Sequence, residues 1–198
     1  INHKLYKKID LLENKNTVSN NITNNITNNI TNKNLDIHLY LNNECKDAMN
    51  LSEFIDKIKL SLDDLLYTKD NGYIKGILNI FLKNLCHLEP TERPIHSISD
   101  KQTHQFYIKD EAGWECDKKE EQLDNSIESV SKKQLLKIKE WEANRPDWNS
   151  TDEGIDEYMK MIKNVMGGSS DSERNENKRK IKRDLKRSFN LPCTSKTT

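Results

Sequence analysis

Apolar residues recur every three or four positions through much of the chain, a spacing that predicts amphipathic helices. The first such stretch follows Asn50, a candidate N-cap with Glu53 in the capping-box position, and continues as one helix to the turn signal at 71–72. A second stretch over 74–85 is apolar over a wider arc, so we expect this helix to be the most buried element. Pro90 prevents it from extending further.

Strict alternation of apolar and polar residues predicts strands in two regions of the chain. Near the start, Ile37, Leu39 and Leu41 alternate with polar neighbours. The central segment predicts three short strands, over 93–97, 104–109 and 114–116. Pro94 restricts the first of these to an edge or to a strand start, and the turn at 110–113 joins the other two into a hairpin.

Helical spacing returns at about Lys119 and stops before Pro146. Ser150 and Glu153 can form a capping box for a further helix, which the glycine pair at 167–168 ends. Together these patterns predict an α+β fold, mostly helical, with a small antiparallel sheet formed by the short central strands.

The N-terminal part has a different composition from the rest. Leu5, Ile9 and Leu12 form one heptad of an apolar seam, typical of a coiled coil that brings copies of a chain together. An Asn-rich tetrapeptide repeat follows, and its low complexity favours a linker. We therefore predict four segments: a coiled-coil-like helical remnant at 1–15, an Asn-rich linker at 16–34, an α+β interaction module at 35–168, and a linker with a basic C-terminal helix or tail at 169–198.

Composition narrows the classes of function. The chain is 33% hydrophobic and 32% charged with no net charge, so no overall field attracts nucleic acid or a membrane. No run of 18 apolar residues occurs, so we expect no membrane partner. The four cysteines are widely scattered, which suits reduced thiols. We expect an intracellular location, which includes the nucleus if the basic run described below acts as an import signal.

Candidate chemistry is sparse. Cys86, His87, His96, His104 and Cys116 lie near one another in the sequence but lack the close ligand pairs of zinc sites, so we predict no metal and no cofactor. No nucleophile, P-loop or dinucleotide motif is present, and we predict that the chain is not an enzyme. A weaker alternative is an enzyme with a site assembled around His96, His104 and Asp110.

The last helical stretch, about 173–189, carries a net charge of +5 over 173–187 and a narrow apolar stripe of Ile181, Leu185 and Phe189. The stripe favours a solvated helix that packs on the body of the protein. The alternative is a nucleic-acid-associated factor whose basic arm contacts phosphates. The candidate contacts are Lys178, Arg179, Lys180, Lys182, Arg183, Lys186 and Arg187.

Arg93, His96 and Trp114 are the candidates for an exposed recognition surface, because Arg and Trp are enriched where proteins bind partners. The structural alternative is that Trp114 fills a small core and Arg93 binds loop carbonyls or a carboxylate. The second interpretation is the more usual one for such residues.

An ordered series of motifs spans about 35–187. It consists of Asn43-Glu44-Cys45-Lys46-Asp47-Ala48-Met49-Asn50, Phe54-Ile55, Gly72-Tyr73, Ile80-Phe81-Leu82-Lys83-Asn84-Leu85, Arg93-Pro94-Ile95-His96, Tyr107-Ile108-Lys109-Asp110, Trp114-Glu115, Trp141, Tyr158 and Met166-Gly167-Gly168. This series resembles the C-terminal region of uncharacterised proteins of giant (nucleocytoplasmic large DNA) viruses of the mimivirus and klosneuvirus type. Ser97 departs from that pattern, which commonly has Cys, and the final helix is more basic.

The family that the chain resembles has no assigned activity, so the resemblance carries none over. Some members of that family carry a two-Cys, two-His zinc finger upstream, but the sequence contains no such finger, so its DNA binding is not carried over. We therefore expect a non-enzymatic interaction or oligomerisation module of a giant-virus protein, with a homo-oligomer or another protein as partner. The resemblance places the expected intracellular location in the host cytoplasm, a virus factory or the virion.

Overall fold

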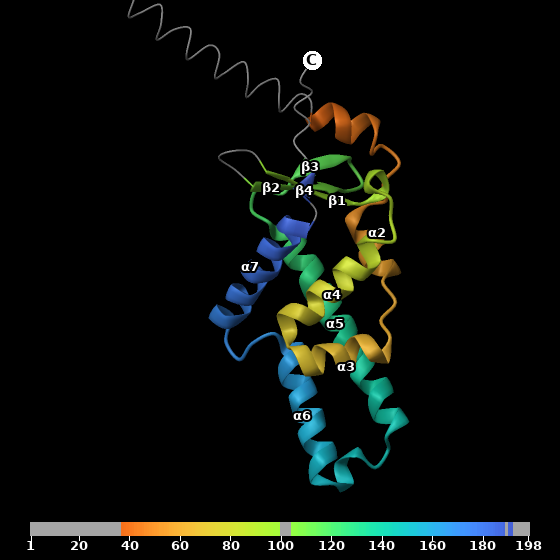
Figure 1. Ribbon diagram of the computed structural model, residues 1–198, viewed down its shortest axis with the longest axis vertical. Helices are drawn as coiled ribbons and strands as arrows, with labels where there is room; N and C mark the ends of the chain where they lie inside the picture. Colours follow the sequence, from red (N-terminus) through yellow and green to blue (C-terminus); the bar gives the residue numbers. More distant parts are fainter. Residues whose placement is uncertain (1–36, 100–103, 189, 192–198) are drawn as a thin grey trace, which may run out of the picture. The chain divides into compact units, whose positions relative to one another are not determined.

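The computed structural model describes residues 37–99, 104–188 and 190–191 (Figure 1). Of these, Ser99, His104, Asn190 and Leu191 are described by their backbone alone. The predictions for 1–15 and 16–34 lie outside the described residues. The chain divides into two units, Ile1–Lys46 and Asp47–Thr198.

In the first unit, residues 37–43 form a helix, so the predicted strand over this stretch is wrong. Burial follows the helical spacing rather than an alternating one: Leu41 and Cys45, four residues apart, are fully buried, whereas Leu39 is 50% exposed. A short run of alternating residues cannot by itself distinguish the two periods.

The second unit begins with two helices in place of the single helix predicted over 50–71. These are α2 (Leu51–Lys57) and α3 (Leu62–Asn71). Asn50 caps α2 as expected, accepting a hydrogen bond from the backbone N–H of Glu53 at 2.7 Å. Ser61 starts α3 through a capping box with Asp64, and this local signal interrupts the otherwise continuous apolar stripe.

Helix α4 (Tyr73–Leu85) follows the turn at Gly72, and only Lys75 and Lys83 are exposed among its residues. Its Ile77, Ile80, Phe81 and Leu85 have no exposed surface. These side chains join residues of α2, the sheet and the later helices in the main hydrophobic core.

The sheet has the strand order β3-β2-β1-β4. Strands β1 (Ile95–Ser99), β2 (His104–Lys109) and β3 (Trp114–Cys116) form the predicted antiparallel arrangement, and Asp110 and Gly113 exchange backbone hydrogen bonds in the hairpin turn. Strand β1 starts after Pro94 because proline cannot donate to the ladder. The short β4 (Asn190–Leu191) adds a parallel edge, which the sequence pattern did not indicate.

Three further helices complete the unit. They are α5 (Glu121–Asn144), α6 (Asp152–Met166) and α7 (Asp171–Ser188). The predicted capping box of Ser150 and Glu153 does not form. Thr151 is the N-cap instead, and its hydroxyl accepts a hydrogen bond from the N–H of Gly154. Gly167 ends α6 in the left-handed conformation, as the glycine pair predicted.

The hydrophobic residues form two cores within this unit. The larger one lies between the sheet, α2, α4, α5 and α7, and the smaller one joins α3, α5 and α6 (Figure 1). Ile181 and Leu185 of α7 belong to the larger core. The compact unit therefore extends from Asp47 through α7, whereas we predicted a module that ended at residue 168. The α+β, mostly helical fold class is confirmed.

Replacing Ser97 of β1 with cysteine is expected to raise the free energy of unfolding by about 1 kcal/mol. Ser97 is fully buried, and its hydroxyl oxygen has no hydrogen-bond partner among the described residues. A thiol in its place behaves as a small hydrophobic group. Urea denaturation measures the change. The control is Ser129→Cys at a half-buried position of α5, where the hydroxyl donates to the carbonyl oxygen of Asn125 and the same substitution should bring no gain. A Ser97→Cys variant no more stable than the parent would contradict the prediction.

Candidate interaction surface

The basic helix α7 is anchored to α5 by ion pairs as well as by its apolar stripe. The ammonium group of Lys182 lies 3.0 Å from a carboxylate oxygen of Glu120 and 2.8 Å from one of Asp124. Lys186 lies 2.5 Å from the other oxygen of Glu120, and Lys178 pairs with Glu128 one turn further along α5. Three of the seven candidate nucleic-acid contacts are thus directed at α5.

The other four candidate contacts also lie near carboxylates, but within α7 itself. Arg179 lies 2.5 Å from Glu176, and Lys180 lies 3.8 Å from the same carboxylate. Arg183 and Arg187 both lie within 4 Å of Asp184. Exposed pairs of this kind contribute little energy and exchange readily. These four residues keep some capacity to bind an anion, whereas the three that face α5 are committed to the fold.

Electrostatics at the α5–α7 contact favour the charged forms of Glu120 and Lys182. Burial raises the pKa of Glu120, but hydrogen bonds from Lys186 and Lys182 outweigh this and hold the pKa below its ordinary value. Burial lowers the pKa of Lys182, and Asp124 and Glu120 reverse the effect so that its pKa is raised. The side chain of Lys182 is only 8% exposed, so these charges interact in a poorly solvated environment.

Arg93, His96 and Trp114 are placed as the structural alternative describes. His96 is 2% exposed and Trp114 is 8% exposed, with their ring centroids 5.3 Å apart. The Nε of Arg93 donates to the carbonyl oxygens of Leu85 and Leu88 at the end of α4. The buried rings have too little surface to contact a partner, which corrects the hypothesis of an exposed recognition surface.

Two residues of the alternative enzyme site, His96 and Asp110, are engaged within the fold. His96 is buried, and the carboxylate of Asp110 accepts hydrogen bonds from the backbone N–H groups of Ala112 and Gly113 in its own turn. The backbone of His104 pairs with Ser99, and its side chain lies outside the described part. Within residues 37–99 and 104–188, no group of three or more His, Cys, Asp or Glu side chains is arranged to hold a metal ion.

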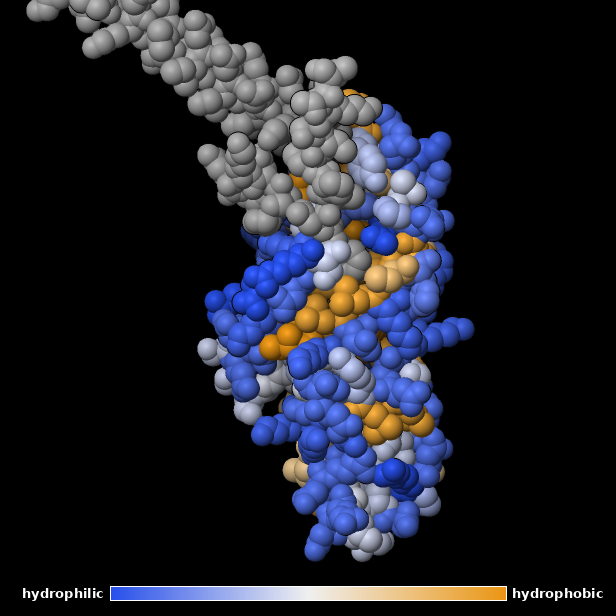
Figure 2. Space-filling model, viewed as in Figure 1, coloured by the Kyte–Doolittle hydropathy of each residue, from blue (hydrophilic) through white to orange (hydrophobic). Residues whose placement is uncertain are grey.

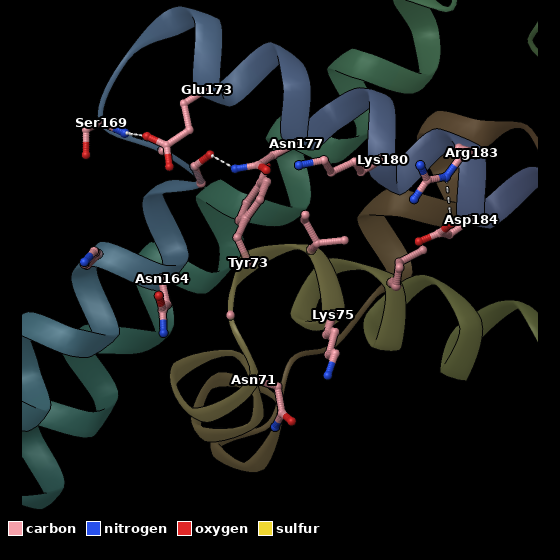
Figure 3. Close-up of a pocket in the computed structure, with 16 residues that line it drawn as sticks. Asn71, Tyr73, Lys75, Asn164, Ser169, Glu173, Asn177, Lys180, Arg183 and Asp184 are labelled. Atoms are coloured by element: carbon pink, nitrogen blue, oxygen red, sulfur yellow. Dashed lines mark hydrogen bonds and ion pairs between the residues drawn. The ribbon is translucent and has the colours of Figure 1, made fainter.

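A groove of about 440 Å³ lies between the first turns of α4, the end of α6 and α7 (Figure 3). Ile74 and Leu78 of α4 contribute apolar lining, and Lys180 and Arg183 of α7 line the opposite side. In Figure 3 the labelled side chains of Lys180 and Asn177 extend from α7 along the groove beside Tyr73.

Hydrogen bonds hold the groove in shape. The side-chain amide of Asn177 donates to the carbonyl of Gly167 at 2.9 Å, and the hydroxyl of Tyr73 bonds that of Ser131 at 2.9 Å. A Cβ atom at Gly167 would lie 2.6 Å from the ring of Tyr73, so glycine is required where α6 meets α4. These contacts join all three helices that line the groove.

The apolar lining of the groove belongs to a longer stripe. Ile74, Leu78 and Leu82 follow one another at a spacing of four on α4 and are only partly buried against the core. Figure 2 shows an apolar band, bordered on both sides by hydrophilic residues, in the region where Figure 1 places α4. The sequence analysis predicted that α4 is the most buried element and did not identify the groove. The sequence feature that could have indicated the groove is the width of the apolar arc of α4, which is larger than one buried face requires.

No helix among the described residues has both the length and the apolar character needed to cross a membrane. Comparison of the chain with protein-family models, with curated proteins and with solved structures finds no significant match.

Proposed function

We propose that this chain is a non-enzymatic protein-interaction module of a giant-virus protein. The observation that carries the proposal is the partly uncovered apolar stripe of Ile74, Leu78 and Leu82 beside the groove. A contiguous apolar surface rimmed by polar residues is typical of a site that binds another protein. The giant-virus assignment rests on the motifs of residues 35–187, and self-association through Leu5, Ile9 and Leu12 is part of the proposal.

The ion pairs of α7 favour a protein partner over nucleic acid. Each of the seven cations lies within 4 Å of a carboxylate oxygen. Glu120, Asp124 and Glu128 offset much of the excess positive charge of the helix. Because nucleic-acid affinity scales with the number of phosphates that free cations neutralise, this arrangement reduces the expected binding.

Affinity purification of the tagged full chain from infected cells tests the proposal. We expect specific proteins to remain bound after nuclease treatment, because an apolar contact does not depend on phosphates. The matched variant is Arg179→Ala with Arg187→Ala, which removes two exposed cations outside the groove and should leave protein retention unchanged. If the parent chain retains nucleic acid but no protein, and the variant loses that nucleic acid, the nucleic-acid alternative would replace the proposal.

Light scattering of the purified chain over a range of concentrations tests the self-association part separately. A mass that rises above that of the monomer is expected. A monomer at every concentration would remove this part for the chain and leave binding to other proteins intact.

A further inference from the structure

We infer that the groove between α4 and α7 binds an amphipathic helix of another protein whose apolar face is flanked by acidic residues. The inference rests on the proposed function and names the partner's chemistry. The floor supplied by Ile74 and Leu78 continues along α4 to Leu82, a straight apolar line suited to a helix with apolar residues at i, i+4 and i+7.

The charge of the lining selects an acidic partner. Lys75, Lys163, Lys180 and Arg183 outnumber the two carboxylates, Glu173 and Asp184, among the lining side chains. Lys180 and Arg183 lie one turn apart on α7, next to the apolar floor. At present Lys180 pairs with Glu176, and Arg183 pairs with Asp184. Because these pairs are exposed, glutamates beside the apolar face of a bound helix can replace both carboxylates at little cost in free energy.

Other occupants fit less well. The chain's own segment 1–15 carries four lysines against Asp10 and Glu13, so it has the same sign as the groove. A second copy of the groove would likewise bring two cationic walls together, because a twofold contact places the same patch on both sides. The phosphates of a nucleic acid would pair with the cations. Phosphates and sugars are polar, however, so covering the apolar floor with them would yield no hydrophobic stabilisation.

Binding of synthetic peptides to the full chain tests the inference by fluorescence anisotropy. The probe is a labelled helix of about 20 residues, long enough to be stable in isolation, with leucines on one face and glutamates on both sides of them. One control peptide has lysine in place of every glutamate, and another has the same composition in scrambled order. A labelled single-stranded oligonucleotide is the fourth probe. We expect the acidic amphipathic peptide to bind at least about tenfold more tightly than any of the other three.

Two variants locate the binding site. Lys180→Glu with Arg183→Glu reverses the groove's cationic side, and Leu78→Gln interrupts its floor, and each is expected to weaken the acidic peptide by about tenfold or more. Arg179→Glu with Arg187→Glu makes the same change of charge at exposed sites outside the groove. This control should alter the affinity by no more than about twofold at physiological salt, where screening is strong. Circular dichroism establishes whether each variant is folded. If Leu78→Gln does not fold, the two charge-reversal variants are enough to locate the binding site.

The inference is overturned if the acidic peptide binds no better than its scrambled form, if the control charge reversal weakens it as much as the groove variant, or if the oligonucleotide binds more tightly. Protein capture from infected cells does not use these peptides. If the acidic peptide does not bind but proteins from infected cells are still captured after nuclease treatment, the assignment of the groove is rejected and the proposed function stands.

Discussion

Replacing Lys182 with methionine is expected to lower the free energy of unfolding by about 2–3 kcal/mol. The ammonium group of Lys182 lies between Glu120 and Asp124, and its removal leaves Asp124 without the cation that faces it. Breaking a buried ion pair by deleting one partner costs about 3–5 kcal/mol. The carboxylates of Glu120 and Asp124 are 26% and 32% exposed, so water relieves part of that cost. Urea denaturation followed by tryptophan fluorescence measures the loss.

The matched control is Arg179→Met on the same helix. Arg179 pairs with Glu176 but is 70% exposed, so its removal should change stability by no more than about 0.5 kcal/mol. Combining Lys182→Met with Asp124→Asn should recover part of the loss, because the second change removes the unpaired charge. Equal stability of the Lys182 and Arg179 variants would show that the α5–α7 ion pairs do not hold α7 in place.

The pH dependence gives a second test of the same cluster. The pKa of Glu120 is below its ordinary value of 4.5 in the folded protein, so its ion pairs stabilise the fold above pH 4.5. This contribution is lost as the pH falls through the lower, folded-state pKa. The difference in stability between the parent and Lys182→Met should therefore be full at neutral pH and shrink below pH 4.5.

Sequence patterns predicted most helices and strands, because their signals are local. Strands β2 and β3 occupy the predicted ranges, since alternating apolar residues and a tight turn are both visible over a few positions. The break between α2 and α3 was also local, in Ser61 and Asp64, but the continuous apolar stripe masked it. Lys133 of α5 adds a long-range contribution at this break by donating to the carbonyls of Asp56 and Ile58.

The surface of the protein was less predictable, because it depends on which helices meet. Ile181 and Leu185 indicated that α7 would pack on the body, and they do. The sequence did not indicate that Lys182 would face Glu120 and Asp124, because these partners are far apart in the chain. The groove has the same origin: Leu78 lies on an apolar helix, and only the positions of α6 and α7 determine that it lines an opening.

The titration of His96 is expected to lower the free energy of unfolding by about 3 kcal/mol when the pH falls from 7 to 4. Burial, and to a smaller extent the charge of Arg93, lowers the pKa of His96 from 6.5 to about 4. Between these two values the unfolded chain binds a proton that the folded protein does not. Stability from this group is therefore complete above pH 6.5 and falls as the pH decreases toward 4, below which both states are protonated.

Comparing the parent with His96→Gln isolates this effect, because other titrating groups are common to both proteins. The free energy of unfolding of the variant should decline less than that of the parent between pH 6.5 and 4, whatever its stability at neutral pH. His87→Gln, at an exposed histidine after α4, is the control for replacing a histidine with glutamine. Parallel curves for the parent and His96→Gln would mean that His96 is protonated in the folded protein. The ring would then have to accommodate a charge beside Arg93 and Trp114, and the packing interpretation of this cluster would be wrong.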